Sequence, residues 1–150
     1  MVQLPAALSS GQGFIERERR EGVRMIYEGP EAVAFMPVCA RYAYEVWAAP
    51  LRPASSFTDL TTSERHDFAR ALKTVLMKFD RLWNRPFPYI LAFHQAPTDG
   101  QPHPEAHLHA ELYPALRMPD RLKYLAGSEN SHEYGVEGVS AITVDSNTKR

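Results

Sequence analysis

The sequence predicts one domain in which several β-strands pack with one long helix. Polar and apolar residues alternate strictly over residues 105–113, a pattern typical of a half-buried strand. Apolar residues recur at three- and four-residue steps over residues 63–83, which predicts an amphipathic helix. The 150 residues suffice for one compact domain with a proper core, and they show no internal repeat and no second domain.

The N-terminal third predicts a short helix and then three strands. Residues 14–20 are dense in charge and predict a short solvated helix, although their basic side chains are also suited to phosphate. Residues 24–28 and 32–36 flank a Gly-Pro pair and predict a hairpin. Residues 42–48 are rich in aromatic and β-branched residues and predict a third strand, ended by two prolines.

The long helix has a clear start and end. Thr61 and Glu64 have the spacing of a capping box, in which each side chain accepts a hydrogen bond from a backbone N–H at the open end of the helix. Asn84 and Pro86 end the helix. We expect its apolar face to pack in the core, and this face consists of Phe68, Leu72, Val75, Leu76, Phe79, Leu82 and Trp83.

Strands are also predicted after the helix. The apolar residues 89–93 predict a strand that ends at His94. The loop of residues 95–104 contains prolines and Asp-Gly, and predicts an antiparallel return into residues 105–113. Residues 139–144 predict a short strand, and residues 145–150 a loose tail.

The alternating strand gathers polar side chains on one face. His107, His109 and Glu111 project from that face, whereas the other face carries Ala106, Leu108, Ala110 and Leu112. Side chains two residues apart lie about 6.5–7 Å from one another, so two imidazoles can approach one metal ion or one phosphoryl group. His94 reaches the same place across the loop. The alternative is a solvated outer face without function, and His94 and Glu111 argue against it because they extend the group.

Charge, hydropathy and cysteine content limit which classes of protein the sequence can belong to. A net charge of −1 gives no electrostatic reason to expect nucleic acid or an acidic membrane surface as a partner. No apolar run is long enough to span a bilayer, and the N-terminus lacks the apolar region of a signal peptide. Cys39 is the only cysteine, which excludes a disulfide framework, and we expect it to be buried. These features fit a protein of the reducing cytoplasm.

Three sequence motifs resemble the C-terminal half of galactose-1-phosphate uridylyltransferase, a member of the histidine-triad superfamily. The motifs are His-Gln-Ala-Pro-Thr-Asp-Gly at 94–100, His-Leu-His-Ala-Glu-Leu-Tyr-Pro at 107–114 and Lys-Tyr-Leu-Ala-Gly-Ser-Glu at 123–129. The similarity extends over about residues 17–129, and residues 130–150 form a divergent tail. The resemblance implies an α+β fold, with a histidine-triad-like antiparallel sheet and packed helices.

The resemblance also implies roles for individual residues. His94, His109 and Glu111 match positions that bind a structural metal, iron or zinc, although the family often has histidine in place of Glu111. Residues that match contacts to the sugar nucleotide are Lys123, Tyr124, Ser128 and Glu129. A further metal ligand, a glutamate, comes from the N-terminal half of the enzyme.

The resemblance implies an enzyme part that is inactive alone. The substrates of the family are a UDP-hexose and a hexose 1-phosphate, and its nucleophile is a histidine of a His-Pro-His motif in the N-terminal half. This sequence contains no His-Pro-His. We therefore expect a homodimer, or pairing with a separate N-terminal half.

Two alternatives stay open. The first is a stand-alone histidine-triad-like nucleotide hydrolase or transferase with His109 as nucleophile. There, Glu111 in place of the last histidine removes a hydrogen-bond donor and adds a repelling charge near the phosphate. The second is a non-catalytic, metal-stabilised binding or dimerisation module.

Overall fold

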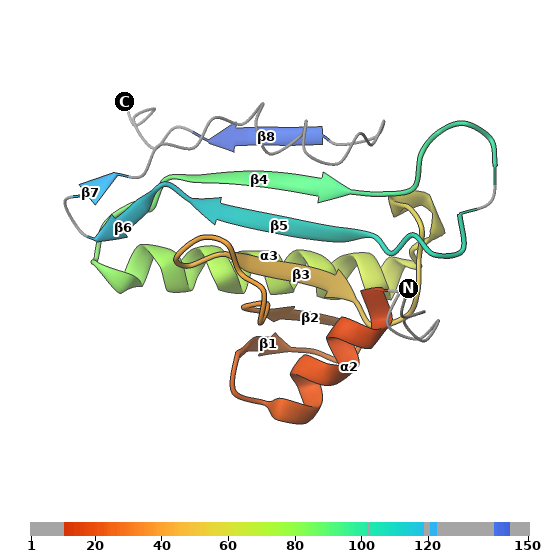
Figure 1. The fold of residues 1–150 in the computed structure, drawn as a ribbon, viewed down its shortest axis with the longest axis horizontal. Helices are drawn as coiled ribbons and strands as arrows, with labels where there is room; N and C mark the ends of the chain where they lie inside the picture. The colour runs from red at the N-terminus through yellow and green to blue at the C-terminus, as the bar shows by residue number, and fades with distance from the viewer. Residues whose placement is uncertain (1–10, 102, 119–120, 123–139, 145–150) are drawn as a thin grey trace, which may run out of the picture.

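The computed structural model describes residues 11–101, 103–118, 121–122 and 140–144, and for several of these the backbone alone. Its helices and strands are arranged around one large sheet (Figure 1). Their bounds in chain order are α2 Gly11–Glu21, β1 Met25–Glu28, β2 Ala32–Phe35, β3 Val46–Pro50, the 3-10 helix η1 Phe57–Asp59, α3 Thr62–Leu82, β4 Tyr89–His94, β5 His109–Pro114, β6 Leu116–Met118, β7 Arg121–Leu122 and β8 Ser140–Val144.

The large sheet has six strands in the order β1-β2-β3-β5-β4-β8, and every neighbouring pair is antiparallel. The predicted hairpin of residues 24–36 is confirmed as β1 and β2. The predicted return of the chain after His94 is also confirmed, because β4 and β5 pair along their full length. The predicted C-terminal strand is present as β8, at the edge of the sheet beside β4 (Figure 1). β6 and β7 form a separate two-stranded sheet.

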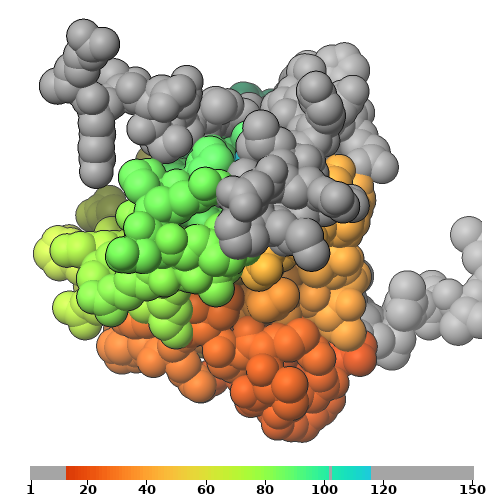
Figure 2. Space-filling view, turned by 90° about the vertical axis from the view of Figure 1, so that its left-hand side faces the viewer, coloured from red at the N-terminus to blue at the C-terminus, as the bar shows by residue number. Residues whose placement is uncertain are grey.

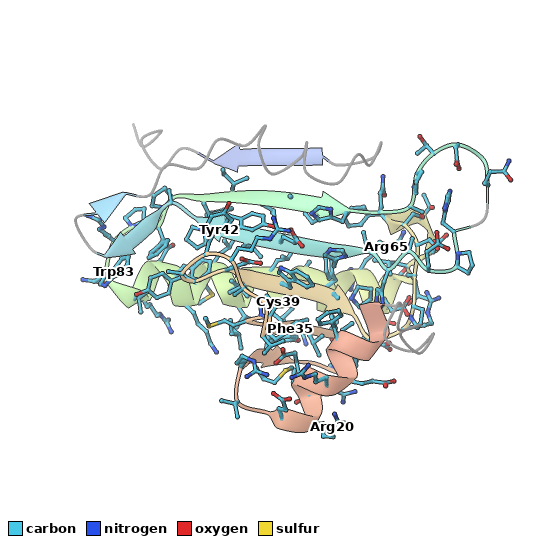
Figure 3. The ribbon with its side chains drawn as sticks, viewed as in Figure 1. Arg20, Phe35, Cys39, Tyr42, Arg65 and Trp83 are labelled. Carbon is cyan, nitrogen blue, oxygen red and sulfur yellow. The ribbon has the colours of Figure 1, made fainter. Side chains whose placement is uncertain are left out.

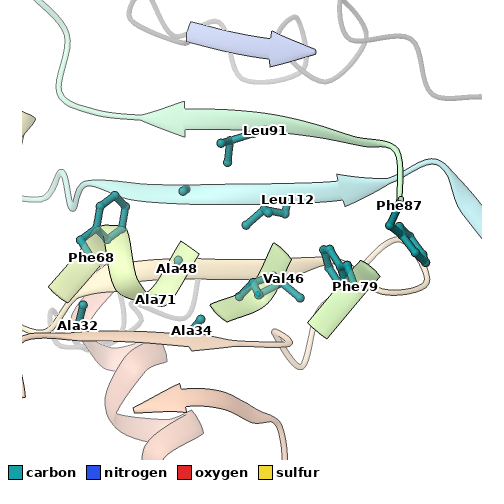
Figure 4. Close-up of a cluster of buried hydrophobic side chains, with 12 residues drawn as sticks. Ala32, Ala34, Val46, Ala48, Phe68, Ala71, Phe79, Phe87, Leu91 and Leu112 are labelled. Atoms are coloured by element: carbon teal, nitrogen blue, oxygen red, sulfur yellow. The ribbon is translucent and has the colours of Figure 1, made fainter. Parts of the chain in front are cut away.

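Helix α3 covers one face of the large sheet and builds the main core (Figure 4). Its capping box is confirmed, since Thr61 accepts from the Glu64 N–H at 3.2 Å and Glu64 accepts from the Thr61 N–H at 2.8 Å. Small alanines on β2, β3 and β5 let the helix approach the sheet closely. The buried members of this core are Ala32, Ala34, Val46, Ala48, Phe68, Ala71, Val75, Phe79, Phe87, Leu91, Ala110 and Leu112. Among the described residues, no helix has the length and apolar character needed to cross a membrane.

Helix α2 packs against the opposite face of the sheet, so the prediction of a solvated helix for residues 14–20 is wrong for one of its sides. Ile15 packs with Val33 and Phe35, whose side chains point away from α3. Glu18 is fully buried, where it accepts hydrogen bonds from Arg24 Nε at 2.7 Å and from the Val38 N–H at 2.9 Å. Figure 2 shows this red-orange N-terminal segment in close contact with the rest of the molecule.

The third strand begins later than the sequence predicts, at Val46 rather than at residue 42. The Glu45 carboxylate accepts hydrogen bonds from the N–H groups of Arg41 and Tyr42, at 2.8 and 3.2 Å, and Tyr44 has a left-handed φ of 63°. Because this carboxylate closes a turn, the chain cannot extend until it has passed Glu45. Pro50 belongs to the strand as its last residue, where a missing N–H is tolerated.

Cys39, which is labelled in Figure 3, is exposed, so the prediction of a buried thiol is wrong. It lies in a turn in which the Ala40 N–H donates to the Pro37 carbonyl at 3.0 Å. A turn places its side chains at the surface, and the apolar neighbours of the cysteine in the sequence did not reveal that turn.

The β1–β2 turn is fastened to α3 by Asp67. This buried carboxylate accepts hydrogen bonds from the N–H groups of Glu31 and Ala32, both at 2.8 Å, and from the Tyr27 hydroxyl. A Cβ atom added at Gly29 would collide with the carboxylate. Glycine is therefore required at this position to let the turn approach the helix.

Gly29→Ala is expected to lower the free energy of unfolding by about 2 kcal/mol, because the added methyl group displaces a charged, buried hydrogen-bond acceptor. Urea denaturation measures the change. In the Asp67→Ala background the same substitution should cost less than half as much, since the nearest colliding group has been removed and the Tyr27 hydroxyl, which also approaches Gly29, has lost the partner that holds it there. Equal costs in the two backgrounds would show that the Gly29–Asp67 contact does not exist.

Candidate functional site

The candidate site lies on the face of the sheet opposite α3. Leu91 and Leu112 point into the core beneath α3, so residues that alternate with them on β4 and β5 point the other way. The pairing of β4 with β5 sets His94 directly opposite His109, and Ala92 opposite Glu111. The register of the two strands therefore brings His94 next to Glu111, although these residues are 17 apart in the sequence.

His94, His109 and Glu111 converge as the sequence predicts. Their potential ligand atoms all lie within 4.8 Å of one another. His94 Nε2 is 3.1 Å from Glu111 Oε2, and His109 Nε2 is 3.4 Å from Glu111 Oε1. The two imidazole rings are stacked, with centroids 4.8 Å apart and planes inclined by 11°. Both Nε2 atoms thus face the same carboxylate.

The His109 ring is held by its surroundings. Its Nδ1 atom donates to the His107 backbone carbonyl at 2.7 Å, which orients the ring so that Nε2 points toward Glu111. Since β5 lies between β3 and β4, Trp47 and His94 flank the ring from two sides. The Trp47 ring centroid is 5.4 Å away, and its indole N–H donates to Glu45 at 2.9 Å.

Glu111 is a buried carboxylate, 6% exposed. Burial raises its pKa, but hydrogen bonds with His109, His94 and Tyr113, together with the charge of His94, outweigh burial and hold the pKa well below the ordinary value. Glu111 is therefore ionised at neutral pH. A buried anion requires a positive partner, which a protonated imidazole or a metal ion supplies.

His107 does not join the site, and the prediction that it shares a face with His109 and Glu111 in one strand is wrong. Strand β5 begins only at His109, and the His107 side chain is buried, with Nε2 donating to the Pro50 carbonyl at 2.9 Å. Its Nδ1 atom is buried without a hydrogen-bond partner. Burial lowers the pKa of His107 more than the bond to Pro50 raises it, so the imidazole stays neutral.

The donor set fits a divalent transition-metal ion. Two neutral imidazole nitrogens and one carboxylate oxygen are a common ligand set for zinc and for non-haem iron, and both metals leave further positions for water or another protein group. The preset Nδ1–H bond of His109 is the type of outer contact that orients a metal-binding histidine. His94, His109 and Glu111 are therefore the residues that would hold such an ion.

The predicted nucleotide contacts at Lys123, Tyr124, Ser128 and Glu129 lie outside the described residues. The divergent tail of residues 130–150 is described only in β8.

Sequence reasoning missed two residues of the site, Trp47 and Tyr113. Tyr113 is 7% exposed and its hydroxyl donates to Glu111 Oε2. It continues the alternation of His109 and Glu111, so the period of two extended to residue 113 could have placed it on the same face. No signal in the sequence points to Trp47, because its proximity to His109 depends on the pairing of β3 with β5.

Comparison with known proteins shows close relatives. Residues 8–125 match the family model described as galactose-1-phosphate uridyl transferase, C-terminal domain. The galactose-1-phosphate uridylyltransferase of Thermotoga maritima is 36% identical over 116 residues, which cover 77% of this chain and 36% of that protein. The Hypocrea jecorina enzyme is 34% identical over 119 residues, which cover 77% of this chain and 31% of that protein. The chain thus spans about a third of the length of these curated relatives.

Solved structures agree with the sequence matches. A uridylyltransferase structure superimposes with a TM-score of 0.64 and 31% identity, over 87% of this chain and 45% of that chain. The ADP-glucose phosphorylase of Arabidopsis thaliana, at a TM-score of 0.56 and 22% identity over 87% of this chain and 44% of that one, shows the same fold. The expected α+β, histidine-triad-like fold is confirmed. The chain belongs to the galactose-1-phosphate uridylyltransferase family and corresponds to its C-terminal domain.

Proposed function

We propose that this chain is the C-terminal part of a UDP-glucose–hexose-1-phosphate uridylyltransferase and that it binds a divalent ion, iron or zinc, through His94, His109 and Glu111. The observation that carries the proposal is the convergence of these three ligand atoms within 4.8 Å. Family membership supports the class of enzyme. A bound ion would supply positive charge to the buried Glu111 carboxylate and would link β4 to β5, so its binding would add to the stability of the fold.

The nucleophilic histidine is proposed to lie in the N-terminal part of the enzyme. The chain has no His-Pro-His, and the Nε2 atom of His109 faces the Glu111 carboxylate at 3.4 Å. An ionised carboxylate at that place repels a phosphoryl group, which argues against His109 as the nucleophile. The role of this chain is then to provide a scaffold, the metal site and contacts to the substrates.

The substrates in this proposal are a UDP-hexose and a hexose 1-phosphate. Lys123, Tyr124, Ser128 and Glu129 are proposed to contact the sugar nucleotide, on the basis of their sequence motif. An ammonium group suits a phosphate, and a phenol ring stacks on a base or donates a hydrogen bond. Residues 1–150 are proposed to form one domain, which acts as a homodimer or pairs with an N-terminal part.

Metal binding is expected to stabilise the chain. Zn²⁺ or Fe²⁺ at about 100 times its dissociation constant should add about 2.7 kcal/mol to the free energy of unfolding, and a chelator should remove this gain. His109→Ala should abolish both the gain and the bound metal, because one of the three ligands is lost. Thermal unfolding and elemental analysis of the dialysed protein measure the two effects.

The matched control for this experiment is His66→Ala, which removes an exposed histidine of α3 far from the cluster. This variant should keep the metal-dependent stabilisation. Metal content that is unchanged in His109→Ala, or wild-type protein that gains no stability from either ion, would contradict the proposed metal site.

The isolated chain is expected to form no covalent uridylyl adduct when it is mixed with UDP-glucose, because the nucleophile is proposed to lie elsewhere. Intact-protein mass spectrometry before and after addition of galactose 1-phosphate measures the adduct, and a full-length uridylyltransferase serves as the positive control. An adduct that disappears in His109→Ala would overturn the proposal and would identify His109 as the nucleophile.

A further inference from the structure

The two oxygens of Glu111 have different surroundings. Oε2 accepts the hydroxyl hydrogen of Tyr113 and also lies 3.1 Å from His94 Nε2. Oε1 faces His109 Nε2 at 3.4 Å. The carboxylate is therefore held in an asymmetric arrangement.

Tyr113 is well placed to maintain this asymmetry. It lies two residues after Glu111 on β5, so the two side chains share one face of the sheet. The residue is buried, and its ring packs edge-on against Tyr42, with ring centroids 5.7 Å apart and planes at 88°. A buried phenol with a fixed ring keeps its hydroxyl in one direction, here toward Oε2.

We propose that Tyr113 is a positioning residue that engages Glu111 Oε2, so that Glu111 offers only Oε1 to a bound metal ion. This inference rests on the metal site of the proposed function. A carboxylate that donates one oxygen keeps the coordination number low, whereas a carboxylate that donates both oxygens favours ions with many oxygen ligands. The Tyr113 hydroxyl thus makes the site favour ions of low coordination number, such as zinc, over ions that take many oxygen ligands, such as calcium.

Tyr113→Phe separates this role from simple packing, because it removes the hydroxyl and keeps the ring. Loss of an outer hydrogen bond to a metal ligand is expected to weaken metal affinity about 10- to 100-fold. The Co²⁺-loaded protein supplies a second signal, since Co²⁺ absorbs visible light more strongly when it has four ligands than when it has five or six. The Co²⁺ bands of Tyr113→Phe should weaken relative to wild type at full occupancy, because both Glu111 oxygens become available.

The control is Tyr89→Phe, which removes a phenol hydroxyl from β4 on the side of the main core. This variant should keep the Co²⁺ affinity and spectrum of the wild type. Unchanged affinity and spectrum in Tyr113→Phe, in a wild type that binds Co²⁺, would overturn this inference and leave the metal site intact. A wild type that binds no Co²⁺ would overturn the metal site and this inference together.

A measurement on the wild type does not depend on how the variant folds. The infrared difference between Zn²⁺-loaded and metal-free protein reports the separation of the two carboxylate stretching bands of Glu111. A separation larger than that of a free carboxylate is expected for one bound oxygen. A smaller separation indicates two bound oxygens and would overturn the inference.

Discussion

The register between β4 and β5 is the constraint on which the candidate site depends. It places His94 opposite His109, and a shift by one residue would turn Glu111 toward α3 and Leu112 toward the site. The connecting loop is fastened at both of its ends to one short segment. The Ala96 N–H donates to the Ser55 backbone carbonyl at 2.8 Å, and the Leu108 N–H donates to the Ala54 backbone carbonyl at 2.7 Å. These two bonds and the apolar side chains beneath α3 therefore fix the geometry of the cluster.

The same strands build both the hydrophobic core and the candidate site, because alternate side chains of a strand point to opposite faces of the sheet. On β5, Ala110 and Leu112 are fully buried beneath α3, whereas His109 and Glu111 face the opposite side. The polar neighbours of Glu111 on this second face explain why a buried anion is tolerated there. Glu111 is surrounded by two imidazoles and the Tyr113 hydroxyl, so its burial is compensated by hydrogen bonds rather than by exposure to water.

The sequence predicted the elements that depend on residues close together in the chain. It failed where the structure depends on contacts between segments far apart in the chain. The period of the long helix and its capping box were sufficient to locate α3 within one residue at each end. The cluster of His94, His109 and Glu111 was predicted because strand alternation and one short loop determine it. The role of His107 was not predictable, because it depends on the Pro50 carbonyl, 57 residues away. The late start of β3 depends on a turn closed by the Glu45 side chain, which no periodicity reveals.

X-ray absorption spectroscopy of the metal-loaded chain reports the ligands of the bound ion itself. We expect a first shell of nitrogen and oxygen atoms, with the outer-shell scattering of two imidazole rings from His94 and His109. A spectrum without imidazole scattering, or one that does not change when His109 is replaced by alanine, would show that this cluster does not bind the ion.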